Sequence, residues 1–234
     1  MKVITIGDLH GKTCWSDLSF DEYDHVVFIG DYLDGDGTTD EVENLLQIIR
    51  LKISNPHKFK LLIGNHEIQY YWHQESTLKK FNLRLSDSFS KILKENEDLF
   101  DVAFQVNNYL WTHAGICNRW IDFAESKYPG FKSDFENSAA NTLNNWHKSD
   151  KRDVLYSIGK AKGGTETGGP FRADISELKT GIPLNINQII GHFRVKSIEK
   201  SEIDGNEVIL TDCLNSSTEW AVLDPFLGNL SVLR

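Results

Sequence analysis

The sequence predicts an α/β fold in which two β-sheets pack face to face between layers of helices. Over the first sixty-odd residues, short apolar runs alternate with helical patterns, which is typical of a parallel or mixed sheet. The last quarter of the chain returns to short strands, which we expect to be mostly antiparallel. With 234 residues the chain can bury a full core, and we expect one domain spanning residues 1–234.

Short apolar runs that stop at a polar cluster predict the buried strands. They cover residues 3–6, 26–29, 61–63, 109–111 and 189–190. Between the first two runs, residues 13–23 indicate a short helix or turn. Residues 40–53 predict a helix, because apolar side chains recur there at helical spacing, Thr39 or Asp40 can cap its start, and Asn55-Pro56 can end it.

The remainder of the chain predicts more helices, two hairpins and a loop. Phe89, Ile92 and Leu93 indicate a helix between residues 68 and 99, and Asn107-Asn108 can join two strands in a tight turn. Residues 118–149 predict two helices separated at Pro129-Gly130, and a glycine-rich loop follows. The closing strands are expected at 188–191, 208–211, 220–223 and 230–233, with a hairpin turn at Asp204-Gly205.

Composition limits the class of protein. Lys and Arg number 25 against 34 Asp and Glu, a net charge of −9, which disfavours a general nucleic-acid or anionic-membrane binder. The three cysteines form no CxxC pair and indicate free thiols in a reducing compartment. The first strand leaves no room for a signal peptide, and no apolar stretch approaches the ~18 residues of a membrane span. We therefore expect a cytoplasmic protein.

A polar cluster follows each of the five apolar strands. Because open α/β sheets place their active sites at the carboxyl ends of strands, these clusters predict one shared site. The clusters are Gly7-Asp8-Leu9-His10-Gly11, Gly30-Asp31-Tyr32-Leu33-Asp34-Gly35, Gly64-Asn65-His66-Glu67, Thr112-His113-Ala114-Gly115 and Gly191-His192.

The first two clusters contain metal-binding residue types. Asp8 and His10 lie two positions apart, so on an extended strand both would leave the same face and could chelate Mn, Fe or Zn. A helix-capping aspartate followed by an incidental histidine explains that pair equally well. The carboxylate of Asp31 could bridge two cations ~3.5–4 Å apart, an arrangement that suits phosphoryl displacement. Asp34 could ligate, cap the next helix, orient a histidine or serve as a turn residue.

The other three clusters add an amide and three imidazoles. The side-chain oxygen of Asn65 would add coordination without adding charge. On an extended chain His66 would point away from Asn65, which leaves an imidazole with an ordinary pKa near ~6.5 free for general acid catalysis. His113 and His192 each follow a strand beside small residues, which lets the backbone approach a metal closely. Either histidine alone would be assigned a structural role, but together with the other clusters both favour metal ligation.

In this order the clusters resemble the motifs of the calcineurin-like metallophosphoesterases. The family pattern runs Asp-x-His, Gly-Asp-x-x-Asp, Gly-Asn-His-Glu, His-Ala-Gly and Gly-His, and the similarity extends from residue 3 to about 195. The resemblance implies a four-layer α/β/β/α sandwich of two mixed sheets with flanking helices. It also implies two divalent metal ions, with Mn as the first choice and Fe, Zn or Ni as alternatives.

The resemblance further assigns a role to each position. Asp8, His10 and Asp31 would hold the first metal. Asp31, as a bridge, would hold the second metal together with Asn65, His113 and His192, and Asn65 would also contact the substrate. His66, supported by Asp34, would protonate the leaving group while a metal-bridging hydroxide attacks phosphorus in line.

One position departs from the pattern of the protein Ser/Thr phosphatases and their bacterial relatives. These usually read Gly-Asp-x-x-Asp-Arg-Gly, and the arginine grips the phosphate as a planar fork. Gly35 stands at that position here. Arg172 is the favoured replacement, because it ends a glycine-rich segment similar to the substrate-side loop of bacterial and phage members; Arg194 and Arg119 are further candidates. A surface arginine at a helix start explains Arg172 equally well.

Several other residues receive structural interpretations. We expect a helical and glycine-rich segment at about 118–172 to flank the substrate. The aromatic run Tyr70-Tyr71-Trp72-His73 and the pair Trp146-His147 are explained more economically by packing than by a pocket wall. His25 and His57 are also expected to be structural.

The leading functional hypothesis is a dinuclear-metal phosphoesterase that hydrolyses a phosphomonoester, on a phosphoprotein or on a small molecule. A phosphodiesterase or a dinucleoside-polyphosphate hydrolase is the alternative, and loss of the clamping arginine fits a diester because it carries less charge. A noncatalytic metal-binding scaffold is the alternative of another class. Retention of all six expected ligands speaks against the scaffold.

Overall fold

The computed structural model describes residues 1–72 and 81–234 of the chain, apart from the side chain of Trp72. Its strands form two sheets. The first sheet has the order β11-β10-β1-β2-β3-β4, in which β1 to β4 run parallel and β10 and β11 are antiparallel additions. The bounds are β1 Val3–Ile6, β2 His25–Phe28, β3 Phe59–Leu62, β4 Phe100–Asp101, β10 Trp220–Asp224 and β11 Asn229–Leu233.

The second sheet has the order β5-β6-β7-β9-β8. Its three central strands are parallel, and its edge strands are antiparallel to their neighbours. The expectation of mostly antiparallel pairing was therefore wrong for β7, which runs parallel to both β6 and β9. The long helical segment between β6 and β7 is a crossover, so β7 begins at the same end of the sheet as β6. The bounds are β5 Ala103–Val106, β6 Tyr109–Thr112, β7 Asn187–Ile190, β8 Glu199–Ile203 and β9 Asn206–Leu210.

The two sheets pack against each other through one face of each. Side chains alternate along β1, so Val3 and Thr5 face the second sheet whereas Ile4 and Ile6 belong to a separate, larger hydrophobic cluster. The indole Nε1 of Trp111 in β6 donates a hydrogen bond to Thr5 Oγ1 in β1 at 2.9 Å. A buried polar pair thus fixes the position of one sheet relative to the other.

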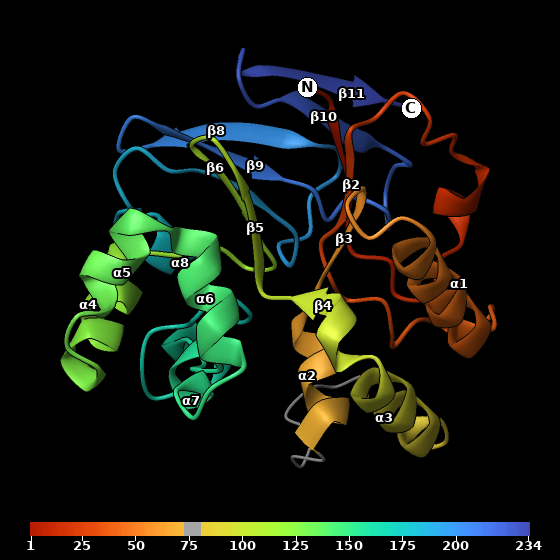
Figure 1. Cartoon of the computed structure of the whole chain (residues 1–234), viewed down its shortest axis with the longest axis horizontal. Helices are drawn as coiled ribbons and strands as arrows, with labels where there is room; N and C mark the ends of the chain where they lie inside the picture. Colours follow the sequence, from red (N-terminus) through yellow and green to blue (C-terminus); the bar gives the residue numbers. More distant parts are fainter. Residues whose placement is uncertain (73–80) are drawn as a thin grey trace.

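Helices cover the outer faces and complete the predicted sandwich. Figure 1 shows α1, α2 and α3 on one side of the molecule and α4 to α8 on the other. Asp40 caps α1 as expected, because its carboxylate accepts a hydrogen bond from the backbone N–H of Glu43 at 3.0 Å. The bounds are α1 Glu41–Ser54, α2 Asn65–Trp72, α3 Ser86–Glu95, α4 Asn118–Lys127, α5 Phe131–Asn137, α6 Ala139–His147, α7 Arg152–Leu155 and α8 Ile175–Leu178.

The segment 118–149 contains three helices instead of the two predicted. Gly130, with φ 99°, separates α4 from α5 as expected. Ser138 has an extended backbone with φ −161° and creates a second break, between α5 and α6. The expected short helix or turn at 13–23 is the 3₁₀ helix Cys14–Asp17.

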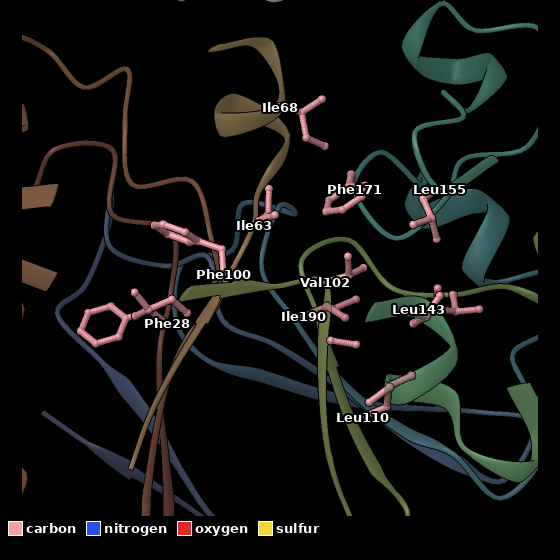
Figure 2. Packing of buried hydrophobic residues seen from close by; sticks show 14 of the residues in the cluster. Phe28, Ile63, Ile68, Phe100, Val102, Leu110, Leu143, Leu155, Phe171 and Ile190 are labelled. Carbon is pink, nitrogen blue, oxygen red and sulfur yellow. The ribbon is translucent and has the colours of Figure 1, made fainter. Parts of the chain in front are cut away.

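The larger hydrophobic cluster, to which Ile4 and Ile6 belong, also includes residues of the helices and of the glycine-rich segment. Phe171 is fully buried in the same cluster as Leu155 and Ile190 (Figure 2). Burial of Phe171 anchors the chain immediately before Arg172. Tyr70 and Tyr71 are also buried in this cluster, in agreement with the packing interpretation, while His73 lies outside the described residues.

In the described part of the chain, none of the helices has both the length and the apolar character needed to cross a membrane.

Candidate active site

The clusters that follow the strands meet in one small pocket of about 190 Å³. Five of the six predicted metal ligands line it, as do His66 and Arg172. The sixth, His113, is fully buried beside Asp31 and Asn65, and Asp34 lies behind His66. The lining residues are Asp8, His10, Asp31, Asn65, His66, Lys162, Arg172, His192, Arg194 and Asp212.

Left-handed backbone positions several of these side chains. His10, Asp31, Asp34 and His192 have φ of 46°, 54°, 64° and 61°, a region in which residues other than glycine are strained. Asp8 and His10 therefore do not converge on an extended strand as predicted, because β1 ends at Ile6 and the chain turns. Backbone N–H groups of Leu9 and His10 donate to the carbonyl oxygen of Asp31 at 3.0 and 2.8 Å. These bonds join the first two clusters and offset part of the strain.

One carboxylate oxygen occupies the centre of the site. Oδ2 of Asp31 lies 3.8 Å from Nε2 of His10, 3.9 Å from Nε2 of His66 and 3.4 Å from Nε2 of His113. The neighbouring histidines hold the pKa of Asp31 well below its usual range, although burial acts in the opposite direction. Two groups of potential metal ligands share Asp31 within the described residues: one adds His10 and His66, and the other adds His113 and His192.

His113 faces three hydrogen-bond acceptors. Its Nδ1 lies 3.0 Å from the carbonyl oxygen of Ile29, and its Nε2 lies 3.0 Å from Oδ1 of Asn65 and 3.4 Å from Oδ2 of Asp31. Burial lowers its pKa, but the carboxylates of Asp31 and Asp8 outweigh burial and raise it to about 10. In the protein alone, a proton on Nε2 of His113 can be shared with the oxygens of Asn65 and Asp31. A metal cation could take the place of that proton among the same nitrogen and oxygen atoms.

Two buried polar atoms at the pocket lack partners among the described residues. They are Nε2 of His192 and Oδ1 of Asp212. The backbone N–H of His192 donates to both oxygens of Asp8, at 3.1 and 2.9 Å, and so holds the His192 loop against that carboxylate. Because an unsatisfied buried polar atom costs about 1–3 kcal/mol, the arrangement favours an additional polar or cationic partner.

Two glycines make room for the carboxylates. A Cβ at Gly64 would overlap the carboxylate of Asp31, and a Cβ at Gly191 would overlap that of Asp8. Imidazole, carboxylate and amide donors with this spacing fit borderline divalent metals such as Mn, Fe or Zn. The donor set, the unpartnered nitrogen of His192 and the space around both carboxylates therefore all fit a divalent metal centre.

The sequence predicts an extended segment at His66, but the structure places this residue on a helix. Helix α2 begins at Asn65, and the backbone N–H of His66 donates to Oδ1 of Asp31 at 2.9 Å. Nδ1 of His66 lies 2.6 Å from Oδ2 of Asp34. Burial lowers the pKa of His66, but Asp31 and Asp34 outweigh it and raise the pKa above its ordinary value. Both carboxylates therefore favour the protonated form of the imidazole.

Of the four roles open to Asp34 from the sequence, the contacts fit the orientation of a histidine. One of its oxygens contacts His66, and the other accepts hydrogen bonds from the hydroxyl of Tyr70 and from the backbone N–H of Asn82, the latter at 3.2 Å. The carboxylate is thereby fixed on both sides.

The sequence profile of the calcineurin-like phosphoesterases matches residues 1–192, most of the chain. The chain belongs to the calcineurin-like phosphoesterase family. It is a metal-dependent phosphoester hydrolase. The match ends at His192, the last of the predicted ligands.

Solved structures with a similar fold carry different names. A cold-active protein-tyrosine phosphatase of a psychrophilic Shewanella is 17% identical with a TM-score of 0.60, over 100% of this chain and 80% of that one. A protein serine/threonine phosphatase from Saccharomyces cerevisiae is 17% identical with a TM-score of 0.59, over 99% of this chain and 78% of that one. A putative diadenosine tetraphosphatase is 13% identical with a TM-score of 0.50, over 99% and 92%. At these identities the likeness shows the fold alone.

Three residues of this phosphoesterase site had no role predicted for them. Glu67 is fully buried and accepts hydrogen bonds from the backbone N–H groups of Asp31, Tyr32 and Gly64, at 2.8, 2.9 and 3.0 Å. Asp212 lies two residues after the end of β9, so the strand-end rule that found the other clusters could have found it. Apart from its place in the glycine-rich segment, no feature of the sequence indicates that Lys162 belongs to the site, because only the folding of that segment brings it to the pocket.

The arginine candidates separate by position. Arg172 is partly buried and lines the pocket, so the alternative interpretation as a surface arginine is wrong. The chain just before it is held in place, because the carbonyl oxygen of Pro170 accepts a hydrogen bond from the N–H of Ala114 at 2.7 Å. Arg194 also lines the pocket. Arg119 is exposed on α4 and does not line it.

The backbone around Gly35 excludes the arginine that other family members carry there. A Cβ at Gly35 would overlap the carbonyl oxygen of His10 and would lie 3.2 Å from Oε1 of Glu41. Glu41 in turn accepts hydrogen bonds from the N–H groups of Asp34 and Gly35, at 2.8 and 3.2 Å. The loop is therefore packed too closely on His10 for a side chain at position 35.

We expect Gly35→Arg to impair the enzyme and not to restore a phosphate clamp. The Cβ would displace His10, and a displacement of about 1 Å at a catalytic site can lower turnover by ~10²-fold. Steady-state kinetics and metal analysis would measure the effect, with Thr38→Arg as the control that adds the same charge at an exposed position three residues away. A lower KM for phosphomonoesters with unchanged metal content would contradict this account.

Proposed function

We propose that the protein is a dinuclear-metal phosphoesterase that hydrolyses phosphomonoesters. The observation that carries the proposal is the position of Asp31 Oδ2, which lies 3.4–3.9 Å from the nitrogens of His10, His66 and His113. A carboxylate with imidazoles on several sides suits a bridge between two cations.

Two sets of side chains, which share Asp31, are proposed as the metal ligands. Asp8, His10 and Asp31 would hold one ion, and Asp31 with Asn65, His113 and His192 would hold the other. Bound divalent cations would supply Lewis acidity towards the phosphoryl oxygens and lower the pKa of water. Mn is the first candidate, with Fe, Zn and Ni as alternatives, because the donors are nitrogen and oxygen atoms without thiolates.

His66 would donate a proton to the departing oxygen of the substrate. Its contact with Asp34 orients the ring, since Nδ1 bonded to the carboxylate directs Nε2 towards the pocket. Asp34 would thus act as a positioning residue, and the carboxylates of Asp31 and Asp34, which raise the pKa of His66 against the effect of burial, would favour the protonated form that donates.

The pocket provides cationic groups for a doubly charged phosphoryl group. Arg172 is placed close enough to Asp31 for the two charges to interact, and it can grip phosphoryl oxygens through its planar fork. Lys162 and Arg194 line the same pocket. Arg172, close to Asp31, favours a monoester dianion over a diester monoanion, despite the absence of the arginine at Gly35.

Comparison of two model substrates tests the monoester assignment. With the Mn²⁺-loaded enzyme, kcat/KM should be at least about tenfold higher for 4-nitrophenyl phosphate than for bis(4-nitrophenyl) phosphate, since one further charge-assisted hydrogen bond contributes ~1.5–3 kcal/mol. A preference for the bis ester would support the phosphodiesterase alternative instead.

A further inference from the structure

A second, larger cavity lies next to the metal pocket and shares three lining residues with it. Lys162, His192 and Arg194 line both, so they form the boundary between them. The second cavity has a volume of about 800 Å³ against about 190 Å³ for the metal pocket. Ligand sites in proteins commonly measure ~300–1,000 Å³, so the second cavity has room for the part of a substrate beyond its phosphoryl group.

Neither cation at this boundary forms a close ion pair, although Asp174 interacts with Lys162 and Asp212 with Arg194 at longer range. Among residues 1–72 and 81–234, the structure gives neither Lys162 nor Arg194 a side-chain hydrogen bond or an ion pair, in contrast to Lys2, which pairs with Glu22, and Arg50, which pairs with Glu43. Nζ of Lys162 lies 5.9 Å from the ring centroid of Phe193, the residue that precedes Arg194. Because no hydrogen-bonded carboxylate neutralises either cation, both can contribute to binding an anionic ligand in a chain of net charge −9.

Carboxylates in the second cavity restrict where an anion can bind. Asp174, Glu199 and Glu202 line this cavity but not the metal pocket. Their carboxylates would repel an anion placed among them, whereas Lys162 and Arg194 would attract one where the two cavities share lining residues. The charges therefore favour binding of a second anion on the side of the second cavity that faces the metal pocket.

We propose that Lys162 and Arg194 form a subsite for a second anionic group of the substrate, adjacent to the hydrolysed phosphoester. This inference rests on the proposed function and narrows its substrate class to phosphomonoesters that carry a further carboxylate or phosphate close to the scissile group. The chemistry shared by these substrates is a negative charge that a guanidinium and an ammonium group can bind together.

A matched pair of aryl phosphates tests the subsite. 3-Carboxyphenyl phosphate and 3-carbamoylphenyl phosphate have nearly the same shape and differ by one charge. The wild-type enzyme should show a kcat/KM about tenfold or more higher for the carboxylate, because hydrogen bonds to charged groups contribute ~1.5–3 kcal/mol. Benzene-1,3-bisphosphate, compared with the same carbamoyl ester, tests whether a phosphate serves as well as a carboxylate.

Variants assign the preference to the two residues. Lys162→Gln/Arg194→Gln should abolish the preference for the anionic ester, whereas Lys179→Gln, which removes a cation that lines only the second cavity, should retain it. Equal losses for both esters in the double variant would mean that these residues grip the scissile phosphate, and would overturn the proposal. Equal kcat/KM values for the two esters in the wild type would also overturn it.

A binding measurement separates this inference from the proposed function. 3-Carboxyphenyl and 3-carbamoylphenyl phosphonate cannot be hydrolysed, and calorimetry of the Mn²⁺-loaded protein measures their affinities without turnover. Tighter binding of the carboxylate by the wild type but not by the double variant would support the subsite even if neither ester were hydrolysed, in which case only the proposed reaction would fail. Equal affinities in the wild type would overturn the subsite whatever the rates.

Discussion

Asp31→Asn is expected to abolish stoichiometric metal binding and to lower phosphoester hydrolysis by about 10³-fold or more. The loss follows from the position of Asp31 Oδ2 beside His10, His66 and His113, which makes this carboxylate common to both ligand sets. Metal ions contribute several kcal/mol to phosphoryl transfer, and each ~1.4 kcal/mol corresponds to a tenfold change in rate. Metal analysis of protein purified without chelator, together with steady-state kinetics, would measure both effects.

A matched control distinguishes loss of the metal centre from loss of the fold. The asparagine side chain can still accept the hydrogen bond that Asp31 Oδ1 receives from the N–H of His66. Asp36→Asn makes the same chemical change at an exposed site five residues away and should leave metal content and turnover unchanged. A metal content in Asp31→Asn equal to that of the wild type would contradict the bridging role. Well under one equivalent of metal in the wild type would favour the noncatalytic scaffold.

His66→Asn is expected to preserve metal content while lowering turnover by about 10²-fold or more, the usual effect of losing a general acid. His66 is close enough to Asp31 and His10 to be considered as a ligand itself, so metal content is the measurement that separates the two roles. His57→Asn, at an exposed turn, is the matched control. Loss of metal in His66→Asn would reassign His66 to the metal site.

The leaving group provides an independent test of the acid role. A good leaving group needs little protonation, so the defect of His66→Asn should be larger with phenyl phosphate than with 4-nitrophenyl phosphate. If His66 only positioned the substrate or a metal, both esters would lose activity by the same factor. Parallel losses would therefore remove His66 from proton transfer.

Local patterns were sufficient for most of the fold. The alternation of Val3 and Thr5 with Ile4 and Ile6 already specifies a strand buried on both faces, and Asp40 marks the start of α1 by a capping preference that acts within one turn. The patterns failed where long-range contacts decide. The break at Ser138 and the parallel pairing of β7 with β6 depend on how α5, α6 and the second sheet pack, and neither leaves a local signal.

The candidate site shows the same division. Its residue types follow directly from the ends of the predicted strands. Their geometry does not, because His10, Asp31 and His192 adopt left-handed backbone that a propensity argument would assign to glycine, and because His66 lies on a helix. Such strained conformations are stabilised only by contacts from other loops, such as the bonds from Leu9 and His10 to the carbonyl oxygen of Asp31.

The sequence by itself determined the family, the sandwich architecture and the set of side chains that can bind metal and move a proton, because strand periodicity and the polar clusters after the strands are local properties of the chain. Only the tertiary structure decided that Asp31 Oδ2 lies among three imidazoles, that the backbone of His10 leaves no room for a side chain at Gly35, and that Lys162 and Arg194 line the same pocket. These facts are distances between segments far apart in the sequence, and they are set by the packing of the two sheets and the crossover segment.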